Sequence, residues 1–264
     1  MKFIKKLYVR FTLWRTPYVI VSFPKSGRTW LRYFFSRYFH FAFARQESLD
    51  FIPKFQTKRG DPLIQFTHVG FDKPHANIEE LYSAFQRKTL VLLVRDPRDV
   101  VVSYYYQVIN RQSNLREITD KNVSQISDFI RDPNLGIQQI INFYNSWYDV
   151  LKKRGVVQMI HYESFQRDPE KSFLKLLRLI GINEIDPNAF KSALQNSHFS
   201  NMSFKERSGL LKGPRFSNLN ANVSERKVRK GKIGGYKDEL LKVDIDYLNK
   251  KMKLLHPVFG YRVD

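Results

Sequence analysis

Two short apolar runs, each followed directly by a helical pattern, constrain the fold of this chain most strongly. They are Tyr18 to Phe23 (YVIVSF) and Thr89 to Val94 (TLVLLV). A strand that is apolar at almost every position is typical of a parallel sheet covered by helices on both faces. Weaker strands are predicted over Leu63 to Thr67 and Val156 to His161. The alternation predicts an α/β fold, with a parallel β-sheet flanked by helices on both faces.

The expected helices follow these strands, and two of them begin at an Asp-Pro pair. Asp96 precedes Pro97, and Asp168 precedes Pro169. An aspartate can cap the free N–H groups of a helix, and proline is favoured at the first helical position. The predicted helices cover residues 29–43, 78–85, 97 onward, 137–154, 169–181 and 241–255.

The length and composition fit a single domain. The 264 residues are 42% hydrophobic and 15% aromatic, which is enough apolar material for a packed core and argues against disorder as the main state. The chain has no cysteine, so disulfides, thiolate metal sites and a cysteine nucleophile are excluded. We expect one domain over residues 1–264, in the cytoplasm.

The charge of the chain indicates anionic partners. Its 45 Lys and Arg residues against 25 Asp and Glu residues leave a formal charge of +20, which suits phosphorylated small molecules, nucleic acid, acidic glycans or anionic lipid. The densest stretch lies between Lys205 and Lys237, with ten basic residues against two acidic ones. Because this stretch lacks an apolar period, we expect a basic, lid-like loop over residues 203–237.

The basic N-terminal segment, residues 1–16, has apolar residues at helical spacing. Such a segment is either an interfacial helix that contacts a membrane surface or a first helix packed on the domain. No apolar run approaches the ~20 residues of a membrane-spanning helix. The alternative to a purely cytoplasmic protein is therefore peripheral membrane contact through residues 1–16.

The first candidate site is the turn between the first strand and its helix, FPKSGRTW at residues 23–30. A strand, a glycine-containing turn and a helix N-terminus direct free backbone N–H groups and the positive end of the helix dipole to one point. Lys25 adds a full positive charge, and the hydroxyls of Ser26 and Thr29 add donors. The turn predicts an anion site, although its lysine precedes the glycine, unlike the Walker pattern GxxxxGK[ST].

The second candidate site is Arg95 at the end of the central strand, with Ser103 eight residues later on the following helix. Ligands of open α/β sheets gather outside the carboxyl ends of the strands. We therefore expect Arg95 to lie near the Lys25 turn, where an arginine can bind a phosphate through two hydrogen bonds.

Together these motifs resemble those of the cytosolic-type sulfotransferases that use 3′-phosphoadenosine 5′-phosphosulfate (PAPS). In that family a PKSGTTW loop binds the 5′-phosphosulfate, and residues 23–30 match it except at Arg28. An arginine and a serine eight residues later hold the 3′-phosphate, as Arg95 and Ser103 would. RKGKIGGYK at residues 229–237 is similar to the closing motif RKGxxGDWK. The resemblance implies a P-loop-like sulfotransferase fold whose basic segment closes over the 3′-phosphate.

Weaker correspondences extend the resemblance to the rest of the site. His68 follows a threonine shortly before the Thr89 strand, where the family has its general base. Trp30 is expected to stack on the adenine, although alone it would be taken for a core aromatic. The cofactor-binding residues that the resemblance implies are Lys25, Ser26, Gly27, Arg28, Thr29, Trp30, Arg95, Ser103, Tyr162, Ser197, Phe199, Met202, Arg229, Lys230 and Gly231, with His68 and Lys25 catalytic.

The chain departs from the family pattern at two points. Phe66 stands two residues before His68, where many relatives carry a lysine that assists sulfuryl transfer. The dimerisation motif KxxxTVxxxE of some relatives is not reproduced over residues 237–246. The oligomeric state is therefore left open.

The resemblance implies an enzyme that moves a sulfuryl group from PAPS to a hydroxyl or amine and releases 3′,5′-ADP. Lys25 would stabilise the leaving phosphate, and His68 would take the acceptor proton. We expect no metal and no nucleic-acid partner. The acceptor is a small molecule, a lipid or a glycan. An apolar pocket for it is suggested by several aromatic residues that could equally be core, namely Phe23, Phe66, Phe71 and Tyr104 to Tyr106.

Two other functions compete with this one. A P-loop kinase or NTPase would use Asp96, after the Thr89 strand, as a magnesium ligand. The arginine directly before it and the missing GK[ST] argue against that. A basic protein that binds nucleic acid or acidic glycan would use the segment 203–237, but such a protein does not need a Lys-Ser-Gly turn at a strand end.

Overall fold

The computed structural model describes residues 17–43, 64–71, 78–111, 125–211, 226 and 228–263. The predicted segment 1–16 lies outside them, as do residues 212–225 and 227 of the predicted basic loop. Within the described residues, four parallel strands form one sheet in the order β2-β1-β3-β4. The strands are β1 (Tyr18–Ser22), β2 (Ile64–Thr67), β3 (Thr89–Val94) and β4 (Met159–His161).

The central strands β1 and β3 are buried on both faces, as their apolar sequences predicted. Val19 and Val21 of β1 belong to one cluster of buried side chains, and Ile20 belongs to another. In β3, Leu92 and Leu93 divide between the same two clusters. Side chains along a strand point alternately to the two faces of the sheet. Because helices cover both faces, apolar side chains are buried on either one. The predicted α/β fold is confirmed.

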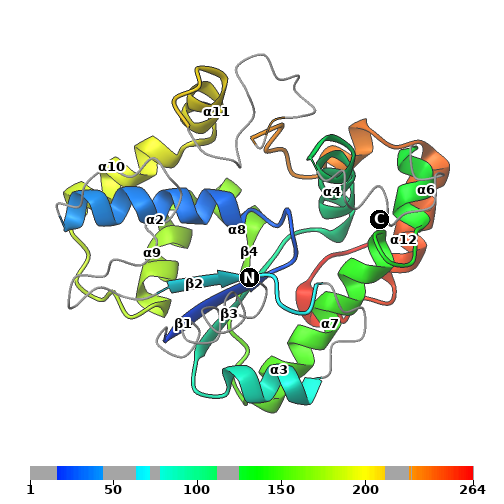
Figure 1. Cartoon of the computed structure of the whole chain (residues 1–264), viewed down its shortest axis with the longest axis horizontal. Coiled ribbons are helices and arrows are strands. Elements are labelled where there is room, and N and C mark those ends of the chain that lie inside the picture. The colour runs from blue at the N-terminus through cyan, green and yellow to red at the C-terminus, as the bar shows by residue number, and fades with distance from the viewer. Residues whose placement is uncertain are drawn as a thin grey trace, which may run out of the picture.

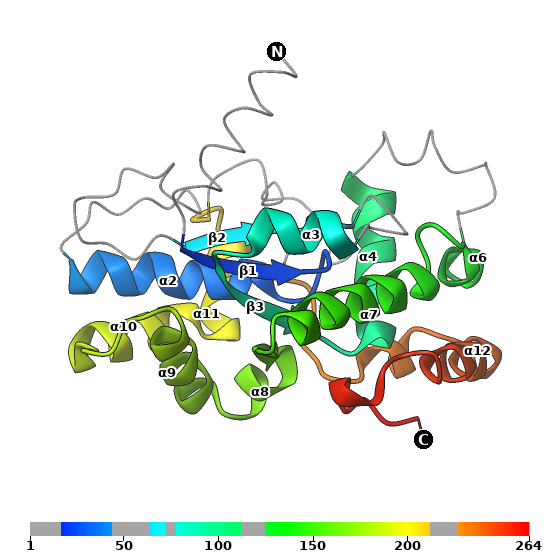
Figure 2. The same ribbon diagram turned by 90° about the horizontal axis from the view of Figure 1, so that it is seen from below.

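Helices cover the two faces of the sheet, as Figures 1 and 2 show. One face packs against α2 (Arg28–Ala42), α9 (Pro169–Leu179) and α10 (Pro187–Ser197). The other packs against α3 (Ile78–Phe85), α4 (Pro97–Arg111), α7 (Ile137–Lys153) and α12 (Lys242–Met252). The remaining elements are α6 (Ile126–Arg131), α8 (Tyr162–Arg167), α11 (Phe199–Arg207), η2 (Gly235–Asp238) and η3 (Pro257–Phe259).

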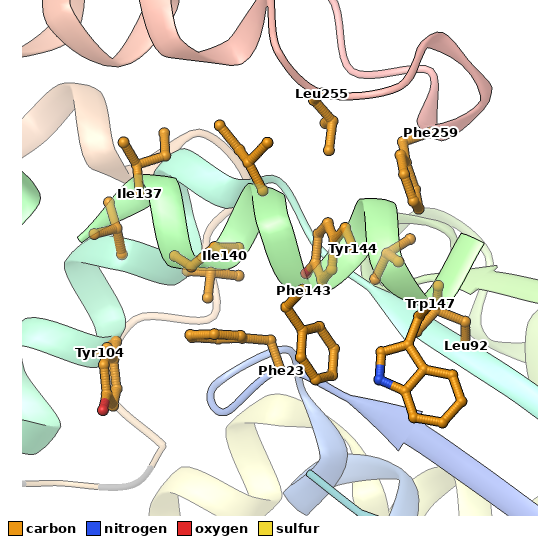
Figure 3. Close-up of a cluster of buried hydrophobic side chains, with 14 of the residues drawn as sticks. Phe23, Leu92, Tyr104, Ile137, Ile140, Phe143, Tyr144, Trp147, Leu255 and Phe259 are labelled. Carbon is orange, nitrogen blue, oxygen red and sulfur yellow. The ribbon is translucent and has the colours of Figure 1, made fainter. Parts of the chain in front are cut away.

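The larger cluster of buried side chains is built around α7 (Figure 3). Phe143 of this helix packs edge-on against Phe23, which follows β1, and Trp147 packs against Phe143. Leu255 and Phe259 close the cluster from the C-terminal segment. The C-terminal segment that carries Leu255 and Phe259 therefore packs against α7.

Both Asp-Pro pairs begin helices, as predicted. The carboxylate of Asp96 accepts a hydrogen bond from the N–H of Arg98 at 2.9 Å, next to the start of α4. Asp168 accepts one from the N–H of Lys171 at 3.0 Å and caps α9. In each case the aspartate satisfies a donor that the first turn leaves open.

Several predicted elements were wrong in extent. The last helix, expected over residues 241–255, covers Lys242–Met252. The strand expected over residues 156–161 is shorter, since β4 begins at Met159 and Val156 and Val157 are exposed. β4 pairs only with the end of β3, and the pairing starts with the carbonyl of Gln158, which accepts from the N–H of Leu92 at 2.9 Å. The loop expected over residues 203–237 begins inside α11 and ends in η2. Only Met202 and Glu206 of α11 are buried, so the helix lacks an apolar stripe.

Among the described residues, no helix is both long and apolar enough to span a bilayer.

Candidate functional site

A cavity of about 400 Å³ lies at the carboxyl ends of the strands. Its walls come from the turns after β1, β2 and β3, from α2, α4, α8 and α11, and from the segment before η2. The predicted site residues that line it are Lys25, Gly27, Arg28, Thr29, Trp30, His68, Arg95, Ser103, Tyr162, Phe199, Met202, Arg229, Lys230 and Gly231. The structure thus brings together side chains separated by about two hundred positions in the sequence.

The turn after β1 has a constrained backbone. Lys25 has a φ of 72° and Gly27 a φ of 98°, both in the left-handed region. A Cβ atom on Gly27 would lie 2.4 Å from the ring of Tyr162. Gly27 is therefore required by its backbone conformation and by the close ring. Among the described residues, no side chain caps the N-terminus of α2 and its first turn has no acid, so this end favours an anion.

Ser26 does not line the cavity, contrary to the prediction that its hydroxyl is a donor there. The side chain is fully buried, and its Oγ lies 3.2 Å from the hydroxyl of Tyr144 on α7. The Tyr144 hydroxyl also accepts from the N–H of Arg95 and donates to the carbonyl of Arg95, each at 3.0 Å. Burial raises the pKa of Tyr144 well above its ordinary value. One neutral hydroxyl thus joins the turns that follow β1 and β3.

His68 lies at the end of β2 with its imidazole fixed by the neighbouring strand. Its Nδ1 is 2.6 Å from the carbonyl oxygen of Ser22. A carbonyl oxygen only accepts, so Nδ1 carries the proton and donates it. In the neutral ring, Nε2 is then the nitrogen with the lone pair. The contact selects the tautomer that can act as a base at Nε2.

The turn that follows His68 is anchored to α7. The N–H of Phe71 donates to the carbonyl of His68 at 2.9 Å. The side-chain amide of Gln139 donates to the carbonyl of Phe71 at 2.7 Å, and the indole of Trp147 donates to the carbonyl of Val69 at 3.2 Å. Two α7 side chains therefore hold the backbone on either side of Gly70.

Arg95 lies between the turn after β1 and the segment 228–236. Its guanidinium donates to the carbonyl of Lys25 at 3.4 Å and to that of Lys232 at 3.5 Å. The same group lies 4.5 Å from the centre of the Tyr162 ring and 3.8 Å from the carboxylate of Asp99. Its Nε is buried and makes no hydrogen bond within the described residues. The predicted proximity of Arg95 to the Lys25 turn is confirmed.

The stretch from residue 228 to residue 236, called the closing segment below, is bound by two buried acids that the sequence analysis did not identify. The carboxylate of Asp99 accepts from the N–H groups of Gly234 and Tyr236 at 2.8 and 3.0 Å. Burial raises the pKa of Asp99. The carboxylate of Glu206 accepts from the N–H of Val228 at 2.7 Å. The segment therefore contacts α4 at one end and α11 at the other.

The two cations at the start of this segment share a third acid. Arg229 Nη1 lies 2.8 Å from one oxygen of Glu239, and Lys230 Nζ lies 3.1 Å from the other. The Arg229 guanidinium also stacks 4.2 Å from the centre of the Tyr106 ring. Both cations line the cavity.

Aromatic side chains form another part of the cavity wall. Trp30 packs edge-on against Tyr162, with ring centres 5.7 Å apart, and lines the cavity beside it. A Cβ atom on Gly231 would lie 2.4 Å from the Phe199 ring. Ser197 is not part of this wall, contrary to prediction. It is buried, and its hydroxyl donates to the carbonyl of Leu194 at 3.3 Å.

The aromatic residues considered for an acceptor pocket divide into two groups. Phe23 is fully buried in the core, and Phe66 packs against α2, 6.1 Å from the ring of Phe35. Phe71 and Tyr104 line the cavity and meet edge-on, 5.7 Å apart. Tyr105 and Tyr106 are half-buried against the core, outside the cavity lining.

The cavity has further lining residues that the sequence analysis missed: Arg32, Gln107, Gln166 and Val228. Three of them follow predicted site residues by one helical turn. Arg32 lies four positions after Arg28 and Gln107 four after Ser103, and Gln166, four after Tyr162, donates to its hydroxyl at 2.8 Å. The i to i+4 spacing on one helix face could have identified all three.

Asp96 is engaged by an arginine. Arg98 donates through Nε and Nη2 to the two carboxylate oxygens of Asp96, at 3.0 and 2.8 Å. This pairing does not suit the magnesium ligand that a P-loop kinase or NTPase would need. Among the described residues, no group of three or more His, Asp or Glu side chains has the arrangement of a metal site.

Comparison with known proteins gives one consistent result. The family model of the sulfotransferase domain matches residues 15–255. Sulfotransferase 1E1 of Bos taurus is 25% identical over 239 residues, covering 83% of this chain and 76% of the relative. The same enzyme of Mus musculus is 25% identical over 248 residues, with the same shares covered.

Solved structures share the fold. Mouse sulfotransferase SULT7A1 complexed with PAP is similar with a TM-score of 0.58 and 20% identity, covering 90% of this chain and 85% of that one. Retinol dehydratase in complex with androsterone and the inactive cofactor PAP is similar with a TM-score of 0.59 and 13% identity, covering 90% and 80%.

Proposed function

This chain belongs to the sulfotransferase family, and from that premise we propose that it transfers a sulfuryl group from PAPS to a hydroxyl or amine of a small-molecule acceptor, releasing 3′,5′-ADP. His68 is the general base, and Lys25 stabilises the leaving phosphate. The observation that carries the proposal is the Nδ1–H bond of His68 to the Ser22 carbonyl, which makes Nε2 the basic nitrogen at a cavity also lined by Lys25.

PAPS supplies the sulfuryl group, and three parts of the cavity wall would hold it. The start of α2 and Lys25 suit the 5′-phosphosulfate, because N–H groups, a helix dipole and a full charge act on one anion. Arg95 and Ser103 suit the 3′-phosphate, with the segment 229–231 closing over it. The PAP complexes of two structural neighbours support this class of ligand.

In the transfer step, the acceptor oxygen or nitrogen forms a bond to sulfur, while the bond between sulfur and the 5′-phosphate oxygen breaks. His68 takes the proton that the acceptor loses, and Lys25 stabilises the negative charge that the 5′-phosphate gains. As in phosphoryl transfer, charge spreads over the peripheral oxygens. The chain would therefore accelerate the transfer mainly through cations and N–H groups that the fold already holds in position to stabilise this charge.

The test of this proposal is His68→Ala with labelled PAPS. A positioned base contributes on the order of 10²–10⁴-fold to rate, so turnover should fall by that factor while 3′,5′-ADP binding stays within about twofold of wild type. A variant that keeps most of its rate would remove His68 from the mechanism. Loss of nucleotide binding as well would mean that His68 supports the donor site instead.

We propose an apolar acceptor, because Phe71 and Tyr104 line the cavity together with His68. Structural neighbours of this chain are complexes with androsterone and with retinol, which supports the same class. A panel of phenols, aliphatic alcohols, lipids and acidic glycans, each with labelled PAPS, separates the acceptors. Transfer to glycans alone would contradict an apolar acceptor.

The proposed setting is a single domain acting in the cytoplasm, with peripheral membrane contact through residues 1–16 as the alternative. Cosedimentation of the full chain with vesicles of neutral and of anionic lipid separates the two settings. Retention by anionic vesicles at physiological salt would support membrane contact.

A further inference from the structure

Glu239 connects the two basic residues that are expected to bind the 3′-phosphate. Its side chain is 7% exposed, and that of Arg229 is 15% exposed. One carboxylate oxygen pairs with Arg229 and the other with Lys230. The Glu239 carboxylate also acts with burial to raise the pKa of Tyr106 to about 12. This acid is therefore a built part of the segment and not a loose surface group.

The neighbouring acid shows that the pairing is selective. Asp238 binds Lys232 with contacts of 2.8 and 2.9 Å, and both side chains are well exposed. Lys232 is not among the residues that line the cavity, whereas Arg229 and Lys230 are. Two consecutive acids thus pair with different cations, and only Glu239 takes those that face the cavity.

A carboxylate in contact with two cations lowers the positive potential that those cations offer to a second anion. A phosphate that binds Arg229 and Lys230 must share them with Glu239. Water screens the pair of Arg229 and Glu239 poorly, because both side chains are largely buried, and screens the more exposed Lys230 better. The donor and its nucleotide product both carry the 3′-phosphate. A group that weakens binding of the donor through this phosphate therefore also weakens binding of the product. Product release limits turnover in many enzymes.

We propose that Glu239 sets the affinity of the nucleotide site by competing with the 3′-phosphate for Arg229 and Lys230, so that 3′,5′-ADP leaves faster than it would from an uncompensated pair of cations. The inference rests on the proposed function, which assigns the 3′-phosphate to these two residues. It concerns an acid that lies outside the cavity lining and touches it only through its partners.

The test compares 3′,5′-ADP with 5′-AMP, which lacks the 3′-phosphate. Glu239→Gln keeps an oxygen that can accept from Arg229 but removes the charge. It should tighten 3′,5′-ADP binding by about tenfold, the effect of one like charge near a phosphate in a partly buried site, and slow its dissociation. Binding of 5′-AMP should change by less than about twofold, since its phosphate lies elsewhere.

Two further variants serve as controls. Asp238→Asn removes one charge from the same segment at an exposed position and should leave both affinities within about twofold, because solvent screens it. Glu239→Asp keeps the charge and should stay near wild type. If Gln and Asp at position 239 shift 3′,5′-ADP binding equally, packing and not charge is responsible, and the proposal is wrong.

Other outcomes are equally decisive. Unchanged or weaker 3′,5′-ADP binding by Glu239→Gln overturns the competition. A wild-type protein that binds 3′,5′-ADP no more tightly than 5′-AMP would instead contradict the proposed 3′-phosphate site, and the inference would fail with it.

Discussion

The hydroxyl of Tyr144 offers the sharpest test of how the donor site is held. Tyr144→Phe removes three contacts at once: the one to the Ser26 hydroxyl at 3.2 Å, and those to the N–H and the carbonyl of Arg95 at 3.0 Å each. The ring can stay where it is, because Phe has the same shape. The variant therefore isolates the hydroxyl.

The expected loss follows from the partners left behind. A net hydrogen bond contributes roughly 1 kcal/mol, and a buried group without a partner costs about 1–3 kcal/mol. Two backbone groups of Arg95 and the hydroxyl of Ser26 lose this partner, so we expect the free energy of unfolding to fall by about 2–4 kcal/mol. For a chain of this size each 1 kcal/mol lowers Tm by roughly 2–4 °C.

Denaturant unfolding gives the stability, and titration gives the affinity. Because the hydroxyl joins the turns proposed for both phosphates, Tyr144→Phe should weaken 3′,5′-ADP and 5′-AMP together. The matched control is Tyr148→Phe, one turn along the same helix, where the half-buried ring packs 4.2 Å from His256. A Tyr144→Phe protein within 0.5 kcal/mol of wild type, a change on the scale of ordinary surface substitutions, and with unchanged nucleotide affinity would refute the reasoning.

Three other predictions concern the cavity wall. Gly27→Ala must place a Cβ 2.4 Å from the Tyr162 ring at a φ of 98°. The free energy of unfolding, measured with denaturant, should therefore fall by about 2 kcal/mol or more, and an unchanged value would mean that the ring moves aside. Arg95→Ala should weaken 3′,5′-ADP about 100-fold in titrations and 5′-AMP far less, and equal losses would contradict the 3′-phosphate assignment. Gln139→Leu leaves the Phe71 carbonyl without its donor, so kcat should fall severalfold with nucleotide affinity unchanged; an unchanged kcat would show that the turn needs no such anchor.

The sequence was informative where a pattern had one physical cause. Thr89 to Val94 was predicted with its observed bounds, because a strand covered on both faces must be apolar at nearly every position. The site could be predicted because parallel strands end at one edge, which brings Lys25 and Arg95 together. The family resemblance then supplied residues from distant parts of the chain, such as His68 and Arg229.

The sequence was uninformative where a residue had two plausible environments. Ser26 stands in an anion-binding motif, yet its hydroxyl turns into the core because Tyr144 offers it a partner there. Tyr144 itself fits the apolar stripe of α7 and carries no local sign of a role at the site. Asp99 and Glu239 would ordinarily be taken for solvated charges among many lysines, and only the fold shows that they are buried against the closing segment.

Helix α7 carries three of the contacts described above, from Gln139, Tyr144 and Trp147. One helix therefore holds both the turns proposed to bind the donor and the turn that carries His68. Adding a single residue between Gln139 and Tyr144 would rotate the Gln139 side chain by about 100° relative to that of Tyr144. Such an insertion would misalign one anchor of the His68 turn with the anchor of the donor turns, while leaving each turn's own sequence untouched.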